Sequence, residues 1–178
     1  MHSFTTERLL IRPLAEQDKE LYLSLYTDAK IMRHIGTPFT VEVAEQAFSK
    51  TIRAMNKPNP TMMTWAIITL DKNEVIGLEA LNFQSPDCAE IGVMLLRRSN
   101  GRLLPEEAIN GLLEYGFNHL LLQQVNARYA SKNLATARVA KKTGFTFIET
   151  NQPADNLSII ESVYKNTWRG QYIKTLLG

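Results

Sequence analysis

The sequence predicts an α/β (α+β) fold in which helices cover both faces of a mixed, mostly antiparallel sheet of about seven strands. Three strand-like segments follow one another between residues 64 and 96 with only short polar turns between them, which is typical of an antiparallel meander. A strongly helical segment and another strand come next, and this order indicates a βαβ unit with one parallel pair. The 178 residues are expected to form a single domain, 1–178.

The first third of the chain is predicted to contain one strand and two helices. Residues Thr6–Leu14 alternate between apolar and charged side chains, as a strand does. Glu16–Ala29 shows helical spacing, and Asp28–Pro38 is expected to be irregular. Thr40 is a plausible N-cap for a second helix. The buried face of that helix is predicted to be Ala44, Ala47, Phe48, Thr51, Ile52 and Met55.

The meander is predicted from three segments rich in β-branched and aromatic residues. The first two, Thr64–Leu70 and Glu74–Phe83, are joined by the polar turn Asp71–Asn73 and form a hairpin. A second turn, Ser85–Asp87, leads into Cys88–Leu96, which delivers the chain into the central loop and helix.

Arg97–Leu122 is the segment around which the chain is organised. Its apolar residues predict a helix whose buried face is Ile109, Leu112, Leu113, Gly116, Phe117 and Leu120. Pro105 is predicted to be the first helical residue, and Glu106 and Glu107 place negative charge where the helix dipole favours it. A basic loop before a helix N-terminus is a candidate anion site, although an ordinary loop-to-helix junction has the same pattern. The loop residues concerned are Arg98, Asn100, Gly101 and Arg102.

The last third of the chain is predicted to add three strands and two helical segments. The short helix Asn133–Lys142 is expected to end at Gly144, a residue suited to a helix C-terminus. Thr167–Leu176 is expected to be a terminal helix or helical turn. The strands are Gln124–Ala130, Thr146–Thr150 and Leu157–Lys165.

Composition and charge exclude several classes of function. A net charge of +2 is too small to indicate an extended basic surface, so nucleic-acid binding is disfavoured. Cys88 is the one cysteine, so an internal disulfide is impossible, and a packed structural cysteine is favoured over a nucleophile. No apolar run approaches the roughly twenty residues of a membrane helix, and no secretory signal is visible. A cytoplasmic protein without membrane association or a metal is expected.

Six strings occur in an order and spacing that is recognisable from about Thr5 to Trp168. They are TERLLIRPL at the start, IMRHIG at 31–36, TWAIITLDKNEVIGLEAL at 64–81, AEIGVMLLRRSNGR at 89–102, EEAINGLLEYGFNHL at 106–120 and NLATARVAKKTGF at 133–145. Together they resemble the GNAT superfamily of acetyl-CoA-dependent N-acetyltransferases, and within it the Rim-type branch of ribosomal-protein-alanine acetyltransferases. The resemblance implies a GNAT-like fold, acetyl-CoA as cosubstrate, and direct transfer to a primary amine on a protein N-terminus or a small molecule.

The resemblance also implies where coenzyme A binds. In this family the loop before the long helix cradles the pyrophosphate with the pattern R/Q-x-x-G-x-G/A. Arg98 and Gly101 match its first anchors, but Leu103 occupies the second glycine position, where a Cβ crowds the phosphates. Pro105 occupies a position that is usually alanine, and it has no N–H to donate. The implied coenzyme-binding residues are Val93, Leu95, Leu96, Arg97, Arg98, Asn100, Gly101, Arg102, Leu103, Asn133 and Thr136.

Catalytic roles are less completely matched. The resemblance implies that backbone N–H groups around Val93–Leu96 polarise the thioester carbonyl. Glu90 is the candidate general base, and an ion-paired or solvated strand glutamate is the alternative. Relatives often carry a tyrosine that protonates the leaving thiolate, and Ala140 stands at that position. Tyr129 is a weaker substitute because a strand tyrosine more often packs. Asn133 has an alternative as a plain helix N-cap, which is compatible with coenzyme binding.

Arg33 and His34 lie where relatives build the wall of the acceptor site, although a lone histidine in a loop is more often structural or exposed. The departures at Leu103, Pro105 and Ala140 leave a second hypothesis open. This is a non-catalytic protein of the same fold that binds an acyl-CoA or a protein partner. The expected partner is otherwise an amine acceptor, with the chain acting as a monomer or homodimer.

Overall fold

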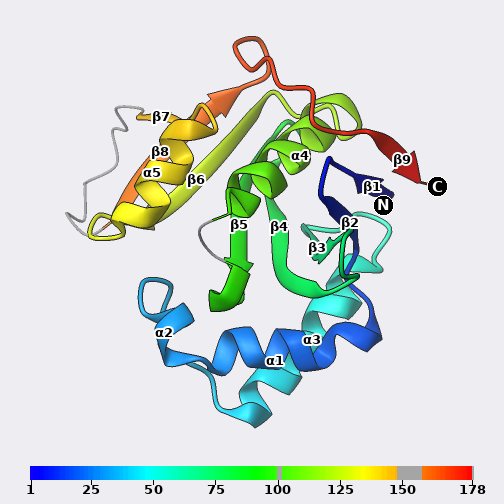
Figure 1. The fold of residues 1–178 in the computed structure, drawn as a ribbon, viewed down its shortest axis with the longest axis vertical. Coiled ribbons are helices and arrows are strands. Elements are labelled where there is room, and N and C mark those ends of the chain that lie inside the picture. The colour runs from blue at the N-terminus through cyan, green and yellow to red at the C-terminus, as the bar shows by residue number, and fades with distance from the viewer. Residues whose placement is uncertain (100–101, 148–157, 178) are drawn as a thin grey trace.

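The computed structural model describes residues 1–99, 102–147 and 158–177. Within them, nine strands form one sheet in the order β7-β8-β6-β5-β4-β3-β2-β1-β9 (Figure 1). Among the described pairs, β5 and β6 run parallel and the others antiparallel. The mixed, largely antiparallel class predicted from the sequence is confirmed. The strands are β1 (Ser3–Thr5), β2 (Leu9–Pro13), β3 (Met62–Thr69), β4 (Val75–Ser85), β5 (Cys88–Leu95), β6 (Gln124–Ala130), β7 (Thr146–Phe147), β8 (Ser158–Tyr164) and β9 (Thr175–Leu177).

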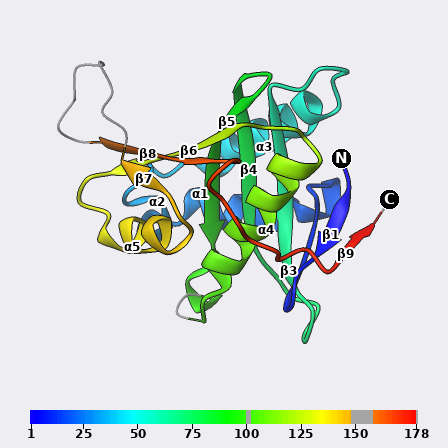
Figure 2. The same ribbon diagram turned by 90° about the horizontal axis from the view of Figure 1, so that it is seen from above.

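Helices cover both faces of the sheet, as Figure 2 shows from above: α1 and α3 lie behind it, and α4 and α5 in front. The α-helices are α1 (Lys19–Thr27), α2 (Ala29–Met32), α3 (Val41–Met55), α4 (Leu104–Asn118) and α5 (Leu134–Lys142). Two short 3₁₀ turns, η1 (Glu16–Asp18) and η2 (Arg97–Ser99), precede α1 and α4. No helix among the described residues is long and apolar enough to cross a membrane.

Two hydrophobic cores follow from the alternation of side chains along the central strands. Trp65 and Ile67 of β3 point into the core beneath α4, whereas Ala66 and Ile68 point into the core beneath α1 and α3. Both faces of β3 are therefore buried, which explains why its sequence is a nearly continuous apolar run.

The N-terminal predictions need two corrections. The segment 28–38 was expected to be irregular, but it contains α2, because the Asp28 carboxylate accepts hydrogen bonds from the backbone N–H groups of Lys30 and Ile31 at 2.7 and 3.1 Å. The helix predicted from residue 16 starts as η1 and becomes α1 at Lys19. The predicted N-cap at Thr40 is confirmed, since its hydroxyl accepts from the N–H of Val43 at 3.3 Å.

The C-terminal helix predicted over Thr167–Leu176 is wrong. This segment ends in strand β9, which pairs antiparallel with β1, and the N–H of Lys174 donates to the carbonyl of Thr5 at 2.7 Å. β1 would otherwise be an open sheet edge, and β9 supplies its missing partners. β1 and β9 also raise the strand count from about seven to nine. Of the predicted strand 146–150, residues 148–150 lie outside the described residues.

Candidate active site

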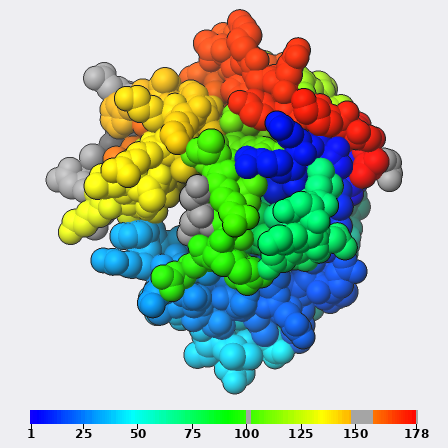
Figure 3. Space-filling model, in the orientation of Figure 1, coloured from blue at the N-terminus to red at the C-terminus, as the bar shows by residue number. Residues whose placement is uncertain are grey.

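The candidate site opens where the two parallel strands separate. β5 and β6 pair only from Cys88–Gln124 to Ile91–Ala127 in the described ladder. Beyond that point β5 stays on β4 as far as Leu95, while β6 stays on β8 as far as Ala130, so the strands diverge (Figure 1). A cleft of about 900 Å³ lies between them. The surface in Figure 3 is hollowed here, between the blue α2, the green start of α4 and the yellow α5.

The hydrogen-bond pattern of the β4–β5 ladder decides which amides of β5 face this cleft. The N–H of Leu96 donates to the carbonyl of Ile76 at 2.8 Å, so antiparallel alternation turns the amide of Met94 toward β4 as well. The amides of Val93 and Leu95 therefore point toward β6, which has already separated. Backbone donors line the cleft at these two predicted residues, whereas the amide of Leu96 is held in the sheet.

One end of the cleft carries the basic loop. Arg97 lines the cleft. The guanidinium of Arg98 forms an ion pair with Glu74 at 2.6 Å in an exposed position, which solvent screens. The predicted residues Asn100 and Gly101 lie outside the described residues.

Leu103 is the N-cap of α4 and has a left-handed backbone, with φ of 58° and ψ of 17°. Glycine adopts this conformation without strain, whereas a leucine does not. The helix begins at Leu104, so Pro105 is its second residue rather than the first, and it lines the cleft. The missing N–H of Pro105 removes one of the donors that the helix N-terminus presents, and the Leu103 side chain supplies no capping acceptor.

The start of α4 is fixed to the sheet by Glu107, which the sequence indicated only as a favourable charge for the dipole. Its buried carboxylate accepts hydrogen bonds from the Thr6 hydroxyl at 2.6 Å and from the Arg8 backbone N–H at 2.8 Å. The Arg8 guanidinium adds an ion pair at 2.6 Å and also donates to the carbonyl of Arg102 at 2.9 Å. The loop end of the cleft is therefore tied to the turn between β1 and β2.

The opposite wall comes from β6 and α5. Asn133 lines the cleft and caps α5, where its side-chain oxygen accepts from the N–H of Thr136 at 3.2 Å, so the plain capping role is realised. Thr136 and Ala140 line the cleft on the same helix. Tyr129 of β6 also lines it, and its side chain is hydrogen-bonded to Glu161. Burial and this carboxylate raise the pKa of the Tyr129 hydroxyl, which therefore stays protonated.

On the α1–α3 face, the cleft has a floor of small residues in cross-strand register. Thr64, Ala80 and Gly92 lie side by side on β3, β4 and β5. Glu90 lies two residues before Gly92 and forms an ion pair with Arg128 at 3.2 Å. The carboxylate is partly exposed, so this pair contributes little stability.

Aromatic rings and a histidine form the outer wall of the cleft on its α1–α3 face. Tyr22 and Tyr26 stack with ring centroids 4.3 Å apart, and Tyr26 stacks on Phe39 at 5.4 Å. His34 lines the cleft, as the sequence predicted, whereas Arg33 is exposed and does not belong to the cleft lining.

Glu79 is the cleft residue that the sequence analysis missed. It lies on β4 in the middle of the sheet, is 1% exposed, and lines the cleft. Neither carboxylate oxygen has a hydrogen-bond partner among the described residues. The signal in the sequence was a single acidic residue within the apolar strand VIGLEAL, which is unusual for a central strand.

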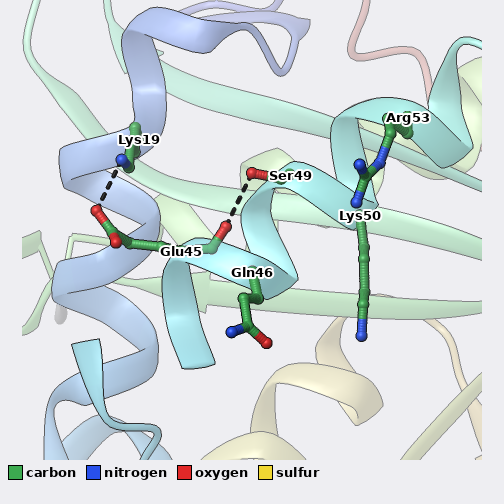
Figure 4. A pocket seen from close by; sticks show the side chains of 6 residues that line it. All are labelled: Lys19, Glu45, Gln46, Ser49, Lys50 and Arg53. Carbon is green, nitrogen blue, oxygen red and sulfur yellow. Dashed lines mark hydrogen bonds and ion pairs between the residues drawn. The ribbon is translucent and has the colours of Figure 1, made fainter. Parts of the chain in front are cut away.

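A second hollow of about 530 Å³ lies on the outer surface between α1 and α3 (Figure 4). Lys19 of α1 reaches Glu45 of α3 there with an ion pair at 2.7 Å, and both side chains are nearly half exposed. The side chains that line this hollow are solvated polar groups, and none of them has a buried, unpaired atom. The cleft between β5 and β6 is therefore the better candidate for an active site. Among the described residues, no cluster of three or more His, Cys, Asp or Glu side chains is arranged to hold a metal ion.

Comparison with known proteins agrees with this geometry. The family model described as the acetyltransferase (GNAT) domain matches residues 8–146. The uncharacterized N-acetyltransferase p20 of Bacillus licheniformis is 26% identical over 148 residues, which cover 82% of this chain and 83% of that protein.

Solved structures show the same fold. The spermidine N-acetyltransferase of Vibrio cholerae, in complex with CoA and spermine, superposes with a TM-score of 0.75 at 18% identity, covering 89% of this chain and 96% of the other. The ribosomal L7/L12 α-N-protein acetyltransferase RimL, in complex with coenzyme A, gives a TM-score of 0.77 at 16% identity, covering 92% of this chain and 98% of the other.

Proposed function

Because the chain belongs to the GNAT family of acetyltransferases, we propose that it transfers the acetyl group of acetyl-CoA to a primary amine by direct attack on the thioester. The observation that carries this proposal is the separation of β5 from β6, which leaves backbone N–H donors of Val93 and Leu95 facing a cleft. Such donors stabilise the negative charge that develops on a carbonyl oxygen during acyl transfer. We also propose that 1–178 acts as one domain, since its two cores share β3 and β4.

The residues of the α4 and α5 side fit coenzyme A. Arg97, Arg98 and Arg102 supply positive charge for the phosphates near the start of α4. The cleft leads from there along β5, past Asn133 and Thr136 of α5, toward the open amides. We assign the further predicted residues, Val93, Leu95, Leu96, Asn100, Gly101 and Leu103, to the same binding region.

The α1–α2 side fits an amine. The stacked tyrosine rings of α1 provide an apolar wall, and Glu90 supplies a carboxylate beside the small floor residue Gly92. In this proposal Glu90 accepts a proton from the amine, directly or through water, after Arg128 has positioned it. His34 borders the entrance, and Arg33 contributes charge outside it.

Two acceptor classes are compatible with this site. The solved structures of the same fold include a spermidine acetyltransferase and a ribosomal-protein acetyltransferase. The Rim-type resemblance favours a protein N-terminus, and we propose a peptide α-amine as the first acceptor to test, with polyamines as the second.

Calorimetric titration with acetyl-CoA, followed by a turnover assay with N-terminal peptides and polyamines, tests the proposed function. We expect saturable binding of acetyl-CoA and release of free CoA thiol that depends on the amine. Binding without turnover on any of these amines would favour the alternative, a non-catalytic protein that binds acyl-CoA.

A further inference from the structure

Glu79 is a buried acid in the cleft lining that has no role in the proposed binding of coenzyme A and the amine. The residue is 1% exposed, and both carboxyl oxygens are without hydrogen-bond partners among the described residues. Burial alone raises the pKa of Glu79 well above its ordinary value, and no neighbouring charge contributes to the shift. A carboxyl group in such surroundings is retained as the neutral acid and holds one proton that it can donate.

The strand register places Glu79 next to the reacting end of the cleft. Glu79 of β4 lies directly opposite Val93 of β5, so their side chains are on the same face of the sheet. Leu96 and Ile76 are joined by a backbone hydrogen bond, and hydrogen-bonded pairs alternate with non-hydrogen-bonded pairs along an antiparallel ladder. Glu79 and Val93 are therefore a non-hydrogen-bonded pair, the type in which the side chains lie closer together. The amide of Val93 is one of the two donors that face the cleft, so Glu79 is one strand away from them.

The other ionisable groups of the cleft are paired with other side chains or belong to the α1–α2 wall and the basic loop. Tyr129 donates its hydroxyl proton to Glu161, and Glu90 is paired with Arg128. From α4, which packs on the same face, Glu106 is paired with Lys142 and Glu107 with Arg8. The remaining ionisable side chains that line the cleft are Tyr22, Tyr26, Lys30, His34 and Arg97.

We propose that Glu79 is the general acid of the transfer, giving its proton to the coenzyme A sulfur as the carbon–sulfur bond breaks. This inference rests on the proposed acetyl transfer. The amine nitrogen forms the new bond to the acetyl carbon, and the electron pair of the broken bond stays on sulfur, which takes the Glu79 proton. The amine loses its extra proton to Glu90 or water, and Glu79 regains a proton from solvent through the cleft, so the products are an amide and a neutral thiol.

The Glu79→Gln variant tests this role, because an amide keeps the size and polarity of the side chain but cannot supply the proton. In the full-length protein, we expect coenzyme A affinity within about three-fold of wild type and kcat about a hundred-fold lower. The wild-type kcat should decline at alkaline pH as Glu79 ionises, and this limb should be absent in the variant. Tyr129→Phe, which removes a different protonated group of the cleft lining, should retain the alkaline limb.

Infrared difference spectra of the coenzyme-free proteins give a readout that does not depend on activity. The wild type minus Glu79→Gln spectrum should contain the C=O stretch of a protonated carboxylic acid at neutral pH, and the band should vanish as pH rises. An ionised Glu79 at neutral pH, a full-rate Glu79→Gln enzyme, or loss of the alkaline limb only in Tyr129→Phe would each overturn the assignment while leaving acetyl transfer intact. A wild-type protein that binds acetyl-CoA but acetylates no amine would overturn the proposed function, and this role with it.

Discussion

Leu103 and Leu121 both have left-handed backbone conformations, with φ of 58° and 60°. For an L-residue with a side chain this conformation costs about 1 kcal/mol. Their side chains are 56% and 65% exposed, so burial does little to offset the strain. Leu103 is the N-cap of α4, two residues before Pro105 of the cleft lining, whereas Leu121 lies in the turn after α4.

We predict that Leu103→Gly and Leu121→Gly each raise the free energy of unfolding by about 0.5 kcal/mol, the relief of strain less the added flexibility of the unfolded chain. Thermal unfolding measures both. Only Leu103→Gly should also tighten coenzyme A binding, because it removes a Cβ from the loop that is proposed to bind the phosphates. Weaker binding by a folded Leu103→Gly protein would show that the leucine packs against the coenzyme instead.

The role of Glu90 depends on whether its carboxylate does more than pair with Arg128. Glu90→Gln should leave coenzyme A affinity unchanged and lower kcat by about a hundred-fold if Glu90 is the base. A purely structural ion pair would instead change kcat little and reduce stability by less than about 1 kcal/mol. Rate and melting temperature measured on the same variant separate the two cases.

Glu79 should also make stability depend on pH. Its pKa in the folded protein lies well above the ordinary value of 4.5. The unfolded chain releases this proton near pH 4.5 and the folded chain keeps it, so the free energy of unfolding falls as pH rises from about 4.5 until Glu79 ionises in the folded protein.

Urea unfolding of wild type and Glu79→Gln at a series of pH values tests this linkage. The free energy of unfolding of the variant minus that of wild type should increase as pH rises above about 4.5. This difference should level off once Glu79 ionises in the folded wild-type protein. Two curves that stay parallel across this range would mean that Glu79 ionises with its ordinary pKa in the folded protein.

At the scale of elements, β4 and β5 approach so closely at Gly77 that a side chain cannot fit. A Cβ added to Gly77 would overlap the carbonyl oxygen of Met94, which is backbone and cannot rotate away. A Cβ added to Gly92, on the same pair of strands, would meet no atom within 4 Å.

Gly77→Ala is therefore predicted to cost about 3 kcal/mol of folding free energy or more, because β5 must shift to accept the methyl group. Gly92→Ala is the matched control and should unfold within about 1 kcal/mol of wild type. Denaturant titration of both variants measures the difference. Equal stabilities would show that β5 slides freely at the edge of the cleft.

Long, periodic elements could be predicted from the sequence, and very short ones could not. The buried face of α4 includes Leu112, Leu113 and Phe117, which the helical spacing had placed there. β1 and β9 have three residues each, too few to show a period, and their pairing joins opposite ends of the chain. Local sequence contains no information about such a partner, so the last segment resembled a helix.

At the scale of the molecule, the sequence indicated the residues proposed to bind coenzyme A better than the interior of the cleft. The basic loop and Asn133 belong to recognisable strings, so they could be named from sequence. The isolation of Glu79 depends on how β3, β4, β5 and α4 pack together, and no local pattern reports whether a carboxyl group finds a partner. The left-handed backbone at Leu103 likewise shows that the departure from glycine introduces strain, which the sequence alone did not report.

The pairing of β1 with β9 has a consequence for the connectivity of the chain. Ser3 lies opposite Leu177 in the sheet, so the two ends are neighbours (Figure 1). A short flexible linker between them would turn the polypeptide into a ring without displacing an element. The ring could then be cut at the exposed polar turn around Asn73, between β3 and β4. Such a circular permutant should fold to the same sheet, because the cyclic order of its elements is unchanged.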